Sequence, residues 1–254
     1  MNIKHAFAVA SSALLALAAL SAPLSPAAAG EQVLRVGTEP AFAPFEYMDE
    51  KDKKFAGFDI DLIEAVGKAG GFKVELISLP FDGIIPAILS GTIDAAISAI
   101  TITDERAKKV HFSQPYYKAG LGVLIHKDFA DSVKTPADLK GHKICVQIGT
   151  SGAMYAESVE GAQVVTFNSS PETYIELGKK GCDAVVNDRP VHAYYMQTTK
   201  PDNMVLLPEF LTAENYGIMT NQNDTELAKK IDAALDKIKS DGTYEKIYSK
   251  YFAR

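Results

Sequence analysis

The order of the predicted elements is the feature that most constrains this fold. Residues 33–115 and residues 121–211 each alternate strand-like runs with helix-like runs. Such alternation is typical of α/β units, in which helices cover a largely parallel sheet. Asp82 and Ser170 are the expected N-caps of two of these helices. Two extended, glycine-bearing runs with few charges follow these units, and we expect hinges in them at residues 116–120 and 212–216. The sequence therefore predicts an α/β protein with two lobes joined by two crossing segments.

The end of the chain is expected to complete the first lobe. Residues 217–254 follow the second crossing and contain an amphipathic helix with Leu227 and Ile231 on its apolar face. We therefore predict that lobe 1 comprises residues 33–115 plus 217–254 and that lobe 2 comprises residues 121–211. Open α/β sheets bind ligands at the carboxyl ends of their strands, so a ligand is expected in a cleft between the lobes.

The first residues have the composition of a targeting segment. Lys4 precedes an apolar, alanine-rich run over residues 6–20, and residues 27–29 read Ala-Ala-Ala, as at a signal-peptide cleavage site. We predict a signal peptide over residues 1–29, which places the mature protein in the periplasm. The alternative is an uncleaved membrane anchor, but the apolar run is short for a membrane span.

Charge and composition exclude several kinds of function. The chain has 32 acidic and 26 basic side chains and a formal net charge of −6, and loss of Lys4 with the signal peptide makes it −7 (−6 − 1). Such an acidic chain has no electrostatic basis for binding nucleic acid or an anionic membrane. The histidines are scattered without metal-ligand spacing. We therefore expect no nucleic-acid partner, no metal and no cofactor.

Two cysteines remain in the predicted mature chain. Cys145 lies in one predicted strand and Cys182 lies just before another. An exported protein can form a disulfide, and the pair would be in range if these strands are neighbours. Adjacent parallel strands rarely give good disulfide geometry, so we slightly favour two buried free thiols. The sequence leaves this choice open.

The stretch from Ser98 to Arg106 combines a strand end, a hydroxyl-rich turn and a short helix. Thr103 is a good helix N-cap, and Asp104 suits the positive end of the helix dipole, whereas Arg106 in the first turn does not. Free backbone N–H groups, Thr101 and Arg106 could together hold a carboxylate. The alternative is a capped helix whose arginine pairs with Asp104 or another surface acid.

Three other features lie at predicted strand ends. Residues 149–153 form a glycine-rich loop before a helix, which is a second candidate anion cradle or an ordinary βα turn. It lacks the lysine of a phosphate-binding loop. Asp188 follows a buried strand, where it could contact a ligand or cap the next helix. Phe42 and Phe81 lie in loops on the same predicted edge, where they could line a cleft or pack in the core.

The mature chain resembles the periplasmic solute-binding proteins for polar amino acids, the substrate-capturing subunits of ABC importers that are grouped as family 3. The resemblance covers essentially the whole mature chain, and its motifs occur in order at family spacing. They are GTEPAFAPFE at 37–46, GFDIDL at 57–62, FDGIIP at 81–86, ITITDER at 100–106, FSQPYY at 112–117, GT at 149–150, DAVVND at 183–188 and DGTYEKIY at 241–248.

The resemblance implies a two-lobed fold of the type II periplasmic binding proteins, with a ligand cleft between lobes joined by two extended hinge strands. It also implies roles for one end of the ligand. Arg106 should grip the α-carboxylate, helped by the backbone N–H groups of Thr101 and Ser151. Asp188, the Thr101 hydroxyl and the Ala99 carbonyl should meet the α-ammonium. A zwitterion would thus meet a fixed opposite charge at each group.

The resemblance assigns the ligand side chain to a second set of residues. Phe42 and Phe81 should sandwich it, while Glu39 and Gln147 should face its far end. A glutamate between aromatic faces suits a guanidinium group, so we favour arginine or another basic amino acid over glutamine or other polar amino acids. Asn187 is a departure, because glutamine-type members can carry histidine there. The implied ligand residues are Glu39, Phe42, Phe81, Ser98, Ala99, Thr101, Arg106, Gln147, Ser151 and Asp188.

A binding module is the main functional hypothesis, with the permease subunits of an ABC importer as its partner and a monomer as its expected state. The rival is an enzyme, because some relatives of this fold are cyclohexadienyl dehydratases acting on prephenate-like acids. Such chemistry needs a general acid over the ligand, for which Glu39 is the candidate. Asp188 and Arg106 fit zwitterion binding more fully, so we expect no catalysis.

Overall fold

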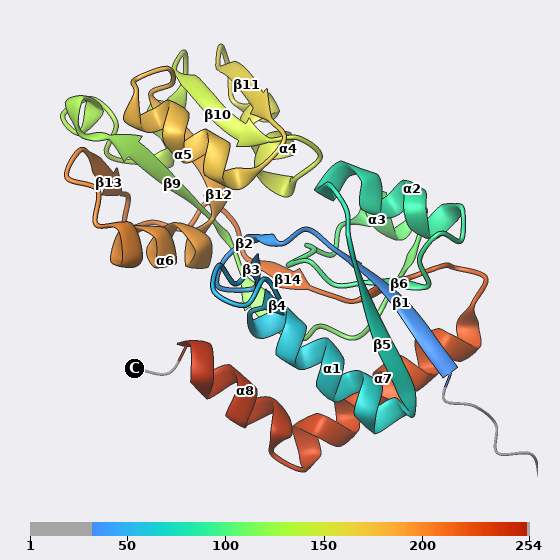
Figure 1. The fold of residues 1–254 in the computed structure, drawn as a ribbon. Coiled ribbons are helices and arrows are strands. Elements are labelled where there is room, and N and C mark those ends of the chain that lie inside the picture. The colour runs from blue at the N-terminus through green and yellow to red at the C-terminus, as the bar shows by residue number, and fades with distance from the viewer. Residues whose placement is uncertain (1–31, 253–254) are drawn as a thin grey trace, which may run out of the picture. The chain divides into compact units, whose positions relative to one another are not determined.

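The computed structural model describes residues 32–252, and the predicted signal peptide lies outside this range. Within the described part, no helix is both long enough and apolar enough to cross a membrane. Two five-stranded sheets dominate the fold (Figure 1). We call the parts of the chain built on the first and second of these sheets lobe 1 and lobe 2.

The sheet of lobe 1 has the strand order β5-β1-β6-β15-β7. Its strands are β1 Gln32–Thr38, β5 Phe72–Ser78, β6 Ala95–Ala96, β7 His111–Phe112 and β15 Met219–Thr220. β1 pairs in parallel with β5 and β6, whereas β15 runs antiparallel to β6 and β7. The chain thus returns to this sheet after leaving lobe 2, and the carboxyl ends of β1 and β6 lead directly into the loops that hold Glu39 and Ser98.

Three helices share one hydrophobic core on lobe 1. They are α1 Phe58–Gly70, α7 Thr225–Ser240 and α8 Thr243–Phe252, which lie side by side in Figure 1. Asp224 caps α7 through the N–H of Leu227, and Leu227 and Ile231 are buried. The two C-terminal helices thus pack on the same core as α1. A helix that buries its apolar stripe gains most of its stability from such packing.

The predicted N-cap of the next helix is wrong. The sequence suggested Asp82, but Asp82 lies inside a 3₁₀ turn, η1 Phe81–Gly83, that leads into α2 Ile84–Leu89 without a side-chain cap. Pro80 precedes this turn in an extended conformation. The turn places Phe81, rather than Asp82, at the edge of the cavity described below.

The sheet of lobe 2 has the strand order β11-β10-β12-β9-β13. Its strands are β9 Leu121–His126, β10 Lys143–Gln147, β11 Gln163–Phe167, β12 Ala184–Asp188 and β13 Met204–Leu206. The helices are α4 Ser151–Ser158, α5 Ser170–Gly178 and α6 Arg189–Thr199, with 3₁₀ turns η2 Lys127–Phe129 and η3 Pro136–Leu139. β10 pairs in parallel with β11 and β12, so the ends of β10 and β12 place Gln147 and Asp188 on one edge.

A two-stranded ribbon is formed by the two segments of the chain that link the strands of one large sheet to those of the other. β8 Tyr117–Ala119 pairs antiparallel with β14 Glu214–Tyr216, inside the two segments where hinges are expected. A further small sheet, β2 Ala41–Phe42, β3 Glu46–Met48 and β4 Phe55–Ala56, follows β1. The hinge role of the β8–β14 ribbon remains a prediction.

The cysteine expectation is corrected by the structure, in which Cys145 and Cys182 form a disulfide with their Cα atoms 5.9 Å apart. Both residues are fully buried. Cys145 is level with Val185 of β12, so Cys182 lies in the bend before that strand begins. The argument against a disulfide assumed two cysteines on paired parallel strands, and that arrangement does not occur here.

Candidate functional site

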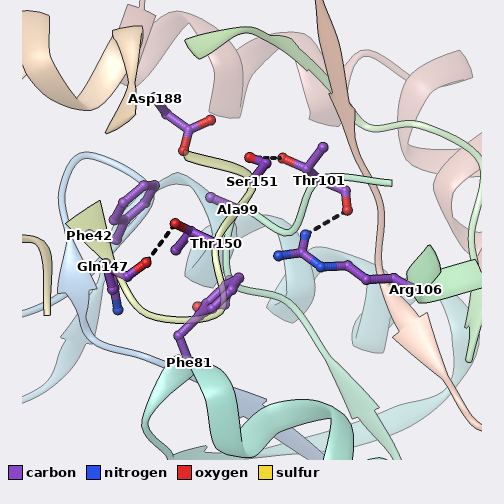
Figure 2. Close-up of a pocket in the computed structure, with 10 residues that line it drawn as sticks. Phe42, Phe81, Ala99, Thr101, Arg106, Gln147, Thr150, Ser151 and Asp188 are labelled. Atoms are coloured by element: carbon purple, nitrogen blue, oxygen red, sulfur yellow. Dashed lines mark hydrogen bonds between the residues drawn. The ribbon is translucent and has the colours of Figure 1, made fainter. Parts of the chain in front are cut away.

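A cavity lies where the loops of lobe 1 meet the strand ends of lobe 2 (Figure 2). About 270 Å³ in and around it is free of atoms, including space that is open to solvent. Every predicted ligand residue except Glu39 lines it, and Thr150 lines it as well. The lining residues are Phe42, Phe81, Ser98, Ala99, Thr101, Arg106, Gln147, Thr150, Ser151 and Asp188. The structure thus brings together residues that are widely separated in the sequence.

Arg106 is a buried cation at one side of this cavity. It belongs to the short helix α3 Asp104–Ala107, whose N-cap is Thr103 as predicted, and only 7% of it is exposed. Its guanidinium donates to the Thr101 carbonyl at 2.7 Å and the Gly149 carbonyl at 2.9 Å, and lies 5.3 Å from the centre of the Phe81 ring. Among residues 32–252 it has no carboxylate within ion-pair distance. The surface-pair alternative is therefore wrong.

Asp188 is the acidic counterpart on the same cavity. It occupies the N-cap position of α6, but its side chain makes no capping hydrogen bond. Its carboxylate accepts a hydrogen bond from the Tyr216 hydroxyl at 2.7 Å instead. Burial raises the pKa of Asp188 to about 7, although the Tyr216 hydrogen bond favours the charged form. The capping alternative is wrong, and Asp188 is free to face a cation.

The backbone between these charges is held in an unusual conformation. Ala99 has a φ of 46°, in the left-handed region that non-glycine residues rarely adopt. Its N–H donates to Asp59 Oδ2 at 2.7 Å, and the Tyr116 hydroxyl donates to the same oxygen at 2.7 Å. Asp59 comes from the GFDIDL motif and is fully buried. This motif thus fixes the loop whose Ala99 carbonyl is predicted to face the ligand.

The Ser98 side chain lines the cavity, but its hydroxyl is hydrogen-bonded to other residues of the protein. Its hydroxyl donates to Glu46 Oε1 at 2.9 Å and accepts from the Glu39 N–H at 3.0 Å. A hydroxyl has one proton to give, so little of Ser98 is left for a ligand. Its structural role is to tie the loop after β6 to the loop after β1.

The opposite end of the cavity contains aromatic rings and a pair of hydrogen-bonded side chains. Phe42 is 6% exposed and Phe81 is half-buried. Gln147 donates through Nε2 to Glu39 Oε2 at 2.6 Å and to the Asn168 carbonyl at 3.1 Å. Burial raises the pKa of Glu39 to about 7, while the hydrogen bond from Gln147 lowers it. Glu39 therefore lies directly behind Gln147 at the wall of the cavity.

The orientation of the Gln147 amide follows from a hydrogen-bond chain. Ser170, predicted as the N-cap of α5, is displaced from that role by Ser169, which forms a capping box with Glu172. The Ser170 hydroxyl donates to Gln147 Oε1 at 3.1 Å and accepts from Asn187 Nδ2 at 2.8 Å. Because Ser170 spends its proton on Oε1, the NH₂ group of Gln147 must face Glu39.

Two residues beside the cavity were missed by the sequence reasoning. Thr150 caps α4 by accepting from the Ala153 N–H, and its hydroxyl donates to the Gln147 carbonyl. Its position before a helix and after Gly149 was a usable signal. Glu214 accepts hydrogen bonds from the hydroxyls of Thr101 and Ser151. Nothing in the sequence distinguished Glu214 from other acids in extended segments.

The chemistry of the site is that of recognition. Arg106 and Asp188 offer opposite charges to one cavity, and the carboxyl group of Glu39 lies behind Gln147 at its other end. Among residues 32–252, no three His, Cys, Asp or Glu side chains come together in a way that could hold a metal ion. The arrangement suits a small ligand that carries both an anionic and a cationic group.

Comparisons with known proteins agree over nearly the whole described chain. The model of the bacterial extracellular solute-binding proteins, family 3, matches residues 34–254. A probable histidine-binding protein of Neisseria gonorrhoeae is 38% identical over 236 residues, which cover 91% of this chain and 87% of the relative. An L-arginine-binding protein of Pseudomonas aeruginosa is 34% identical over 250 residues, which cover 95% of this chain and 96% of the relative.

A solved structure extends this likeness to three dimensions. An ancestral arginine-binding protein bound to arginine superposes with a TM-score of 0.83 at 43% sequence identity. The match covers 87% of this chain and 98% of that chain. The two folds are therefore alike along their whole common length.

Proposed function

The chain belongs to family 3 of the bacterial extracellular solute-binding proteins, and from this premise we propose that it captures a polar L-amino acid for an ABC importer. Arginine or another basic amino acid is the ligand that its site favours. The likeness to the ancestral arginine-binding protein supports the predicted fold class, a two-lobed type II periplasmic-binding-protein fold. The proposed product of binding is a reversible complex, without turnover.

The presence of Arg106 and Asp188 on the wall of one cavity is the observation that carries this proposal. Arg106 is a nearly buried cation whose guanidinium, within the described part of the chain, donates to two carbonyl oxygens and lies over the Phe81 ring without an ion-pair partner. Asp188 is a buried carboxyl group that accepts one hydroxyl. Buried charges are costly unless they are paired, and an amino-acid zwitterion would pair both at once. Its carboxylate would lie on Arg106 and its ammonium on Asp188.

The far end of the cavity supports a basic side chain. Glu39 is 7% exposed and stands behind Gln147, and the Phe42 and Phe81 rings flank the same space. A guanidinium group can donate to a carboxylate while its faces stack on aromatic rings. Relatives named for arginine and histidine are consistent with this chemistry. Glutamine is the weaker candidate, because a neutral amide gains less from Glu39.

The cellular setting is proposed on the same grounds. An extracellular solute-binding protein of this family would act in the periplasm after removal of residues 1–29, as a monomer that meets the permease subunits of an importer. We propose no enzyme activity, since relatives that match most of the chain are named as histidine- and arginine-binding proteins. Arg106 and Asp188 are accounted for by the zwitterion, and Glu39 by the ligand's basic group.

A thermal-shift screen tests the proposal. The mature protein is heated alone and with each of the common L-amino acids, ornithine and citrulline, and hits are measured by calorimetry. A ligand that binds only the folded state raises the melting temperature. We expect arginine to give the largest shift, followed by other basic amino acids. The absence of a shift with any amino acid would contradict the function, and a largest shift with glutamine would contradict the basic ligand.

A further inference from the structure

We propose that Glu214 is a positioning residue for the ligand's α-ammonium group, because it takes up the hydroxyl protons of Thr101 and Ser151. This inference rests on the proposed function and adds a residue to it. Glu214 does not line the cavity. Its role would be to decide which way two cavity hydroxyls face.

The hydrogen bonds around Glu214 are the first part of the argument. The Thr101 hydroxyl donates to Glu214 Oε2 at 2.6 Å, and the Ser151 hydroxyl donates to the same oxygen at 3.0 Å. The Thr212 hydroxyl donates to Oε1 at 2.9 Å. An ionised carboxylate can only accept, so all three protons must point at Glu214.

The direction of these protons fixes what the cavity offers. A hydroxyl has one proton and two lone pairs. Once Thr101 has given its proton to Glu214, its oxygen can only accept from a ligand, and the same holds for Ser151. The two oxygens lie 3.3 Å apart on the cavity wall (Figure 2). A wall of acceptors suits an ammonium group and disfavours a carboxylate oxygen.

The three partners come from different parts of the fold. Thr101 lies in the loop after β6 of lobe 1, Ser151 is the first residue of α4 in lobe 2, and Glu214 begins the crossing strand β14. One carboxylate oxygen therefore joins both lobes to the segment between them. The hydroxyls can be oriented together only when the lobes are as close as they are in this structure.

The negative charge of Glu214, like the oriented hydroxyls, favours an ammonium group in the cavity. Its negative charge raises the pKa of Asp188 and opposes the lowering of the Arg106 pKa by burial. It is thus close enough to favour a cation at this end of the cavity. Measurements at pH 8 keep Asp188, with its pKa of about 7, largely ionised in every variant.

The test compares two ligands that differ only in the α-amino group, L-arginine and 5-guanidinopentanoate, by competition calorimetry on the mature protein. Glu214→Ala removes the acceptor, so the Thr101 hydroxyl is free to turn its proton into the cavity. We expect L-arginine to bind roughly 10- to 100-fold more weakly, as for the loss of a charge-assisted hydrogen bond. The analogue without the amino group should change less than about threefold.

Two further variants separate orientation from charge. Glu214→Gln keeps a carbonyl oxygen that can accept both hydroxyl protons, so it should restore most of the arginine affinity. Glu105→Ala removes another acid whose charge acts on Arg106, but Glu105 is exposed and makes no hydrogen bond to Thr101 or Ser151 among the described residues. We expect it to leave both affinities within about twofold.

The outcomes distinguish this inference from the proposed function. Equal losses for the two ligands in Glu214→Ala, or no loss for either, would overturn the positioning role while leaving amino-acid binding intact. Parent protein that binds no amino acid would overturn both. If Glu214→Ala does not fold, Thr101→Val provides the same selectivity readout. Equal losses for L-arginine and for the analogue in Thr101→Val would contradict the proposal.

Discussion

The two ends of the cavity are built on different principles. At the end that holds Arg106, Asp188 and Thr101, each polar group is fixed by the protein, yet neither charge is neutralised by an ion pair within the described residues. At the other end, Glu39 and Gln147 bond to each other. A zwitterion would supply a partner for both charges at the first end. At the second end, a ligand side chain must either compete with the hydrogen bond between Gln147 and Glu39 or bind in addition to it.

This difference separates ligand class from ligand identity. The first end is the same for every α-amino acid, so it should contribute equally to all of them. The second end acts only on the side chain, through a carboxyl group whose charge depends on its surroundings. Variants at the two ends should therefore fall into two groups, those that weaken all amino acids alike and those that change the preference among them.

The largest expected effect is that of Arg106→Ala. A ligand carboxylate would lose its cationic partner, and removing one member of a buried charge pair costs about 2–5 kcal/mol. Arginine and citrulline should both lose roughly 30- to 5000-fold in affinity by calorimetry. Lys108→Ala, which removes an exposed cation from the end of the same short helix, is the matched control. A loss confined to arginine would break the division between the two ends.

Glu39→Gln should give the next largest effect, and only at the far end. The guanidinium of arginine would lose an ionic partner, at a cost of about 1.5–3 kcal/mol, or roughly 10- to 150-fold in affinity. Citrulline has a neutral group in the same place and should change less than about threefold. Asp82→Asn removes an exposed acid whose charge also acts on Glu39 and serves as the control. Equal losses for both ligands would show that Glu39 does not select charge.

A pH series sharpens the comparison because both ends contain a carboxyl group with a raised pKa. Burial raises the pKa values of Glu39 and Asp188 to about 7, above their pKa values in the unfolded chain. The folded state therefore binds more protons than the unfolded state, and the free energy of unfolding falls as the pH rises through 7. Between pH 6.5 and 8 we expect a loss of about 1–2 kcal/mol, seen as a lower melting temperature of the unliganded protein.

Ligand binding should show the opposite trend over the same range. Arginine needs Glu39 in its ionised form, so the ratio of arginine affinity to citrulline affinity should rise from pH 6 to pH 8. Asp188 serves both ligands equally and cancels in this ratio. A ratio that does not depend on pH would remove Glu39 from the account of specificity.

Ser170→Ala should have the smallest effect. The variant leaves Gln147 Oε1 and one Asn187 N–H without their present partner, which costs about 1–3 kcal/mol of stability. Tyr174→Phe is a matched control, since the Tyr174 hydroxyl accepts from the same Asn187 amide but does not touch Gln147. Thermal unfolding should show similar losses for both. A change in the arginine-to-citrulline ratio should occur only in Ser170→Ala and stay within about fivefold.

The sequence was most informative where local signals and periodicity agree. Residue spacing predicts the alternation of strands and helices in each lobe. It also predicts the cap at Thr103 and the amphipathic helix after Asp224. The buried position of Arg106 did not, because a short helix with an arginine is equally compatible with a surface ion pair. Its burial depends on contacts with the Phe81 ring and with the Gly149 carbonyl of lobe 2, and local sequence does not encode these contacts.

The errors have specific physical causes. Ser169 and Ser170 can both cap a helix, and the capping box with Glu172 selects Ser169, which sends Ser170 to Gln147 instead. The disulfide depends on Cys182 lying in a bend before β12. Glu214 accepts hydrogen bonds from two cavity hydroxyls that lie 113 and 63 residues away in the chain. Each of these features depends on tertiary position, which spacing along the sequence does not reveal.

A crystal structure of the mature protein with L-arginine tests the central claim most directly. The account predicts the α-carboxylate on Arg106, the α-ammonium within hydrogen-bond distance of Asp188 and Thr101, and the guanidinium on Glu39 between the rings of Phe42 and Phe81. Arginine bound in the reverse orientation, with its guanidinium near Asp188, or bound outside this cavity, would contradict the assignment of the two ends.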